Sequence, residues 1–108
     1  MGDYERMLEL NPNDPDTNKQ LGIVLLAAGK TNEAIGYAKR ACELTGDRDA
    51  ESLDVLANSF AEAGRFAEAK ATAEKALNAA KISGRENLIV DIQKRMELYQ
   101  AGMRDRQK

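Results

Sequence analysis

The amino-acid sequence predicts an all-α protein made of stacked helical pairs, and three observations support this prediction. The chain has 108 residues, 43% of them hydrophobic and 31% charged, which suits one folded domain. Seventeen residues are alanine and only 5% are aromatic, so a core must form by close approach of helices rather than by large side chains. The third observation is an internal repeat, because the sequence matches itself when shifted by 35 residues.

The repeat is the most specific of these observations. A shift of 35 residues aligns Leu21 with Leu56 and Gly29 with Gly64. Alanine matches in the same register carry less weight, since alanine is abundant. Within each unit the apolar residues recur three and four positions apart, which is the period of a helix. Each unit is therefore predicted to be two helices joined by a tight turn.

Helices are expected at 3–10, 15–28, 31–44, 50–63, 66–82 and 85–101, followed by a short basic tail. Asp14 and Asp49 stand where an N-cap is needed, and Pro15 fits the first helical position. Gly29 and Gly64 stand where a glycine in the left-handed conformation ends a helix. These residues define the boundaries of the first helix in each unit.

Two further caps are expected from local pattern. Thr31 follows Gly29 closely and is expected to cap the next helix. Ser83 precedes Glu86 by three residues, which is the capping-box spacing, so Ser83 is expected to open the last helix. Gly102 is expected to close that helix.

A helical pair of about 34 residues with a Trp, Leu-Gly, Tyr, Ala, Phe and Pro pattern is typical of the tetratricopeptide repeat, and this sequence closely resembles it. The pattern positions are Asn18, Leu21, Gly22, Leu25, Gly29, Ala34, Ala38 and Ala41 in the first unit, and Leu53, Leu56, Ala57, Phe60, Gly64, Ala69, Ala73 and Ala76 in the second. The segment 4–12 resembles the second helix of a preceding repeat, and 85–101 resembles the solvating helix that closes such arrays. The resemblance implies a right-handed α-solenoid with a C-terminal capping helix.

A single repeat domain is expected over 1–108, with a half repeat at 3–12, repeats at 15–48 and 50–83, a capping helix at 85–101 and a tail at 102–108. Because the array begins within a repeat, we expect the chain to be the C-terminal piece of a longer array. A repeat helix without its neighbour cannot bury its apolar face. Tyr4, Met7 and Leu8 are therefore expected to be partly uncovered and to drive self-association into a homo-oligomer.

Composition argues against several classes of function. The chain has no His and one Cys, so the commonest general base and metal ligand are missing, and we expect no catalytic residues, cofactor or metal. A net charge of −2 gives no reason to expect nucleic acid as a partner. No apolar run approaches the roughly 20 residues of a membrane span, so membrane insertion is not expected. The segment 1–11 lacks the apolar stretch of a signal peptide, and a cytoplasmic location is expected unless a longer parent carries an export signal.

Three short motifs have simpler explanations than chemistry. The Gly-Lys-Thr segment at 29–31 lacks the earlier glycine and the strand of a phosphate-binding loop, which favours a helix end followed by a helix start. Asp47, Asp49 and Glu51 begin like a calcium loop but lack its glycine and final glutamate, which favours helix capping. Cys42 lies on an apolar stripe, which favours a buried small residue over a reactive thiol.

The resemblance also indicates a function. In this family, first-helix positions that do not pack inward contact a ligand in a concave groove. These positions are Asp16, Lys19, Ile23, Leu26 and Ala27 in the first unit and Glu51, Asp54, Asn58, Ala61 and Glu62 in the second. Four acids against one base favour a peptide of cationic and apolar character, although ordinary solvation or repeat stacking would also explain each residue. The resemblance therefore implies a non-catalytic protein–protein interaction scaffold that binds a peptide or partner helix.

Two other functions stay open at this point. The chain could be an accessory or self-assembly domain of a larger enzyme, such as a glycosyltransferase or a methyltransferase, with catalysis located elsewhere. It could also be an engineered array, but its repeats are unequal, whereas consensus designs repeat nearly verbatim.

Overall fold

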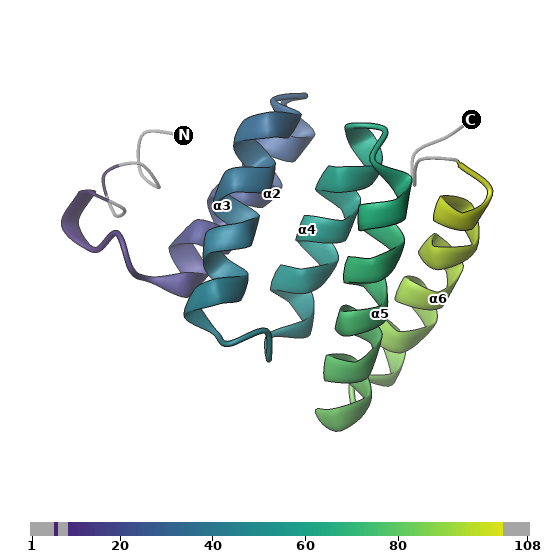
Figure 1. Ribbon diagram of the computed structural model, residues 1–108. Helices are drawn as coiled ribbons and strands as arrows, with labels where there is room; N and C mark the ends of the chain where they lie inside the picture. The colour runs from purple at the N-terminus through teal and green to yellow at the C-terminus, as the bar shows by residue number, and fades with distance from the viewer. Residues whose placement is uncertain (1–5, 7–8, 103–108) are drawn as a thin grey trace.

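The computed structural model describes residue 6 and residues 9–102, and the regular secondary structure in this part of the chain is helical. Its helices are α2 (Pro15–Ala27), α3 (Thr31–Leu44), α4 (Ala50–Glu62), α5 (Phe66–Ile82) and α6 (Glu86–Gln100). Figure 1 shows the pairs α2/α3 and α4/α5 standing side by side, with α6 packed against α5. The described residues form no strand, so the prediction of an all-α helical repeat is confirmed.

The predicted ends of the first helices are confirmed. The side chains of Asp14 and Asp49 accept hydrogen bonds from the backbone N–H groups of Thr17 (3.1 Å) and Ser52 (3.3 Å), so each aspartate is an N-cap. Gly29 and Gly64 have φ angles of 79° and 78°. Glycine reaches this left-handed region without steric cost, and in both turns it lets the chain reverse direction.

Two predicted caps are wrong. Thr31 is already the first helical residue of α3, and the N-cap position before it makes no side-chain hydrogen bond. The Ser83 hydroxyl donates backwards to the carbonyl of Ala79 (2.9 Å), so this serine ends α5 instead of opening α6. A serine after a helix can bond to the turn behind it or to the turn ahead. Here α5 continues to Ile82 and α6 begins at Glu86, which leaves Ser83 nearer to the earlier turn.

Small side chains bring the helices of each pair together. The alanines at the close-approach positions are at most 1% exposed: Ala34, Ala38, Ala41, Ala69, Ala73 and Ala76. A Cβ atom placed on Gly22 of α2 would lie 3.5 Å from the Cβ atom of Ala38 in α3 and 3.4 Å from Cγ1 of Val55 in α4. Close packing over methyl groups therefore forms the core together with a few large buried side chains such as Leu21, Leu53 and Tyr99.

The last helix, α6, is the least embedded of the five. It buries two residues, Ile92 and Tyr99, whereas α4 buries ten. Asp91 stands 35 residues after Leu56, which packs inward at 6% exposure, but Asp91 itself is exposed. This position normally faces the second helix of the same repeat, and no such helix follows α6 in the part of the chain that is described. The polar residue at this position fits a capping helix.

Candidate functional site

The predicted ligand-contacting residues lie along one face of α2 and one face of α4. In each helix they are spaced by three and four residues, which places them on the same side. We call this surface the groove face, and it comprises Asp16, Lys19, Ile23, Leu26 and Ala27 of α2 with Glu51, Asp54, Asn58, Ala61 and Glu62 of α4. The two halves adjoin, because the Lys19 ammonium donates a hydrogen bond of 3.2 Å to the Glu51 carboxylate.

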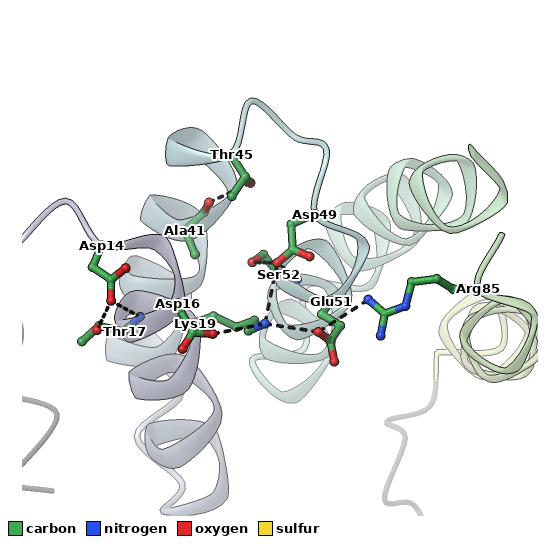
Figure 2. Close-up of polar contacts among 10 residues, drawn as sticks. All are labelled: Asp14, Asp16, Thr17, Lys19, Ala41, Thr45, Asp49, Glu51, Ser52 and Arg85. Atoms are coloured by element: carbon green, nitrogen blue, oxygen red, sulfur yellow. Dashed lines mark hydrogen bonds and ion pairs between the residues drawn. The ribbon is translucent and has the colours of Figure 1, made fainter. Parts of the chain in front are cut away.

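Side chains of alternating charge connect the starts of α2, α4 and α6, as Figure 2 shows. The Lys19 ammonium lies 3.6 Å from the Asp16 carboxylate, 3.9 Å from that of Asp49 and 3.2 Å from that of Glu51. On its other side, Glu51 lies 3.5 Å from the guanidinium of Arg85, the residue just before α6. The Lys19 side chain is only 13% exposed, so its charge interacts mainly with these carboxylates of the protein and not with solvent.

The pKa values of the central pair move apart. Burial alone would lower the pKa of Lys19, but the hydrogen bond to Glu51 and the neighbouring carboxylates outweigh it, so the pKa rises above its ordinary value of 10.5. The hydrogen bond from Lys19 lowers the pKa of Glu51 below its ordinary 4.5, and Arg85 contributes further. Both side chains are therefore charged at neutral pH, and each stabilises the charged form of the other.

The middle of the α4 half is covered by α6. The guanidinium of Arg95 donates from Nη2 to Oδ2 of Asp54 (2.6 Å) and from Nε to Oδ1 (3.3 Å). The hydroxyl of Tyr99 donates to the side-chain carbonyl of Asn58. Asp54 is 8% exposed as a result. Asn58 is half-buried, so α6 covers Asp54 more completely than Asn58.

Sequence reasoning missed Arg95 and Tyr99 as members of the site. Both pairs join residues 41 positions apart, beyond the reach of any local pattern. One signal was present, since Tyr99 belongs to the apolar stripe of the last helix and Arg95 lies one turn before it on the same side.

The α2 half remains open. Ile23 is 40% exposed, and the Asp16 side chain is 72% exposed. Ala27 is exposed and Leu26 is half-buried. On α4, Glu62 is half-buried and Ala61 is buried at 1%. Accessible groove residues therefore gather on α2 and at the end of α4.

The acidic residues of segment 47–51 and Cys42 make the capping, pairing and packing contacts of structural residues. Of the three acids in the segment 47–51, Asp47 pairs with Lys75 at 3.9 Å, Asp49 caps α4 and Glu51 pairs as described. No cluster of three or more potential metal ligands occurs among the described residues. Cys42 is 3% exposed, and burial raises the pKa of its thiol to about 12. It packs as a small apolar residue, as predicted.

The predicted self-association residues Tyr4, Met7 and Leu8 lie outside the described residues, so that role stays a prediction. Leu10, within the described part, is helical and 82% exposed. None of the described helices combines the length and apolar character needed to cross a membrane.

Comparison with known families agrees with the geometry. A model of the tetratricopeptide repeat matches residues 15–82, from the first residue of α2 to the last residue of α5. A search of curated proteins finds no significant match. The family match spans two complete helical pairs and more than half of the chain, and the protein therefore belongs to the tetratricopeptide repeat family.

Proposed function

We propose that this domain is a non-catalytic interaction scaffold that binds a peptide or a partner helix along the groove face. Repeats of this family generally mediate protein–protein interactions, and stacked repeats present extended concave surfaces for that purpose. The proposal specifies the surface and the chemistry of the ligand.

One observation carries the proposal: Ile23 is a large apolar side chain left 40% exposed on the groove face of α2. Leu26 lies three residues further along and is half-buried. An apolar side chain of a ligand would remove this surface from water at a gain of about 25 cal/mol per Å². Ile23 is thus the proposed anchor of the interaction.

Asp16 gives the proposed site its charge preference. Its carboxylate is on the same face as Ile23, two helical turns earlier, and is largely exposed. Asp16 also lies 3.6 Å from Lys19, but its side chain is 72% exposed, against 47% for Glu51 and 12% for Asp54, so the acids of α4 contribute less. The proposed ligand therefore places an apolar residue on Ile23 and a cationic residue on Asp16.

The test is a peptide selection followed by variants. Peptides selected from a random library on the full chain should combine lysine or arginine with apolar residues. Ile23→Asp should weaken their binding about ten-fold or more, since it places a charge where an apolar contact forms. The matched control is Val90→Asp, which changes a 48% exposed apolar residue of α6.

Asp16→Lys tests the charge preference separately. It should reduce affinity for cationic peptides and make that affinity insensitive to salt, because an exposed ion pair is screened. Selected peptides that bind the wild type, Ile23→Asp and Asp16→Lys equally would refute the proposal. Their binding is measured by isothermal titration, with circular dichroism to show that each variant is folded.

A further inference from the structure

Helix α6 contributes two polar side chains that bond to the groove face of α4. Arg95 and Tyr99 are four residues apart and lie on one side of α6. Their acceptors, Asp54 and Asn58, are also four residues apart, on the groove face of α4. Two helices thus meet through two matched polar pairs, at positions where the register of the repeats places ligand contacts.

These contacts are shielded from water. The side chains of Arg95 and Asp54 are 18% and 12% exposed, and the pair has two hydrogen bonds. Bidentate pairing of arginine with a carboxylate is among the stronger polar contacts in proteins and requires a defined geometry. Breaking a buried ion pair of this kind is unfavourable, so the Arg95–Asp54 pair favours the docked position of α6.

Helix α6 also buries the fewest side chains of the five helices, although Leu88, Ile89 and Met96 pack against the core while partly buried. Only Ile92 and Tyr99 are buried in α6, while the neighbouring α4 and α5 bury ten and six residues. Local opening costs least where few side chains are buried, so segments of this kind open below the free energy of global unfolding. Figure 1 shows α6 at the outer end of the helical stack, in contact with α5 on one side.

From these observations we infer that α6 is a built-in occupant of the α4 half of the groove face. A partner helix that carries an arginine and a tyrosine four residues apart replaces it there. This inference rests on the proposed function and adds its regulation: the α2 half is open to ligand, whereas the α4 half is filled until α6 leaves. A tethered occupant competes at an effective concentration on the order of millimolar, so the intact chain binds such a partner weakly.

The probe is a fluorescent synthetic peptide with the sequence of residues 86–101, titrated into the full chain. The variant Arg95→Gln/Tyr99→Phe removes both polar contacts from the tethered helix and leaves Asp54 and Asn58 in place. This variant should bind the peptide about ten-fold or more tightly than the wild type does. The matched control Lys94→Gln removes one positive charge from an exposed position of α6 and should bind like the wild type.

A second peptide identifies the contacts that matter. A peptide carrying the same Arg95→Gln and Tyr99→Phe changes should lose the gain in affinity. Amide hydrogen exchange along α6 should be faster in the double variant than in the wild type or in Lys94→Gln. Should the double variant fail to fold, Tyr99→Phe alone serves, because it removes one hydroxyl and keeps the packed ring.

Equal peptide affinity in the wild type, the double variant and Lys94→Gln would overturn the inference. Unchanged hydrogen exchange in α6 would overturn it as well. The proposed function is judged separately through Ile23→Asp. If selected peptides still depend on Ile23 while α6 release has no effect, the scaffold function stands and the built-in occupant does not.

Discussion

The Lys19 ammonium on α2 lies 3.2 Å from the Glu51 carboxylate on α4, and this ion pair joins the first helices of the two repeats. Lys19→Ala would leave three carboxylates near one another without their shared cation. We expect the free energy of unfolding to fall by about 1 kcal/mol, because the pair is partly exposed and water replaces part of the lost interaction. Urea unfolding measures it, with Lys39→Ala at an exposed position of α3 as the control. An equal loss in both variants would show that the pair contributes nothing specific.

The same ion pair predicts a response to acid. The folded-state pKa of Glu51 is below its ordinary value of 4.5, chiefly because of the Lys19 hydrogen bond. Its contribution to stability is therefore present above about pH 4.5 and is lost as the pH falls through the folded-state pKa. Wild-type stability should fall more steeply than that of Glu51→Gln over this range, by less than about 1 kcal/mol because the pair is partly exposed.

Urea midpoints from pH 7 to pH 3 measure this difference. Glu33→Gln, at an exposed position of α3, is the matched control and should keep the wild-type dependence. Parallel pH curves for the wild type and Glu51→Gln would contradict the prediction.

A substitution at Gly22 is expected to raise the stability of the protein rather than lower it. A Cβ atom there would meet Val55 and Ala38 at 3.4 and 3.5 Å, which is ordinary contact, and the equivalent residue of the second repeat is Ala57. Gly22→Ala should therefore raise stability by about 0.5–1 kcal/mol through helix propensity. Gly22→Leu should lower it by about 1–3 kcal/mol, because the larger side chain forces the helices apart. Thermal unfolding distinguishes them, and a similar loss in both variants would be the contrary result.

The Asp49 cap can be separated from its charge. Asp49→Ala removes the hydrogen bond to the Ser52 N–H group and should cost about 1 kcal/mol. Asn is also a good N-cap, so Asp49→Asn should retain most of the stability while losing the charge near Lys19. Asp91→Ala, at an exposed position of α6, should change stability by less than about 0.5 kcal/mol. If Asp49→Asn costs as much as Asp49→Ala, charge rather than capping is the cause.

Cys42 should be chemically silent in the folded protein. It is 3% exposed, and burial raises the pKa of its thiol to about 12, so little thiolate is present at neutral pH. A colorimetric disulfide reagent should react slowly in buffer, and the rate should rise with urea in step with unfolding. Fast reaction without denaturant would contradict the observed burial.

Local chemistry was enough to predict where most helices begin and end. Asp14 and Asp49 bond to N–H groups three residues ahead, and Gly29 and Gly64 reverse the chain within a single turn. Such interactions depend on adjacent residues, so the sequence displays them directly. Ser83 was misread because a serine between two helices has acceptors and donors on both sides, and only the end of α5 decides between them.

The contacts between α6 and the groove face of α4 could not be predicted in the same way. Asp54 and Asn58 were identified by their positions in the repeat, but their partners Arg95 and Tyr99 are 41 residues further along. Whether these side chains meet depends on how α4, α5 and α6 stack and on the length of α5, which has 17 residues against 14 in α3. The repeat register predicts on which side of a helix a residue lies. The residues of other helices that contact it are known only from the packed structure.

The alanine contacts of Ala38 and Ala73 have a consequence for the shape of the stack. Both are 1% exposed or less and belong to the packed core, so a larger side chain at either position must displace its neighbours. In a linear stack each repeat is positioned only by the one before it. A larger side chain at Ala38 would change the angle between α2 and α3. The orientation of α2 relative to the second repeat would change with it. The small size of these alanine side chains is therefore a condition for the way the helices stack.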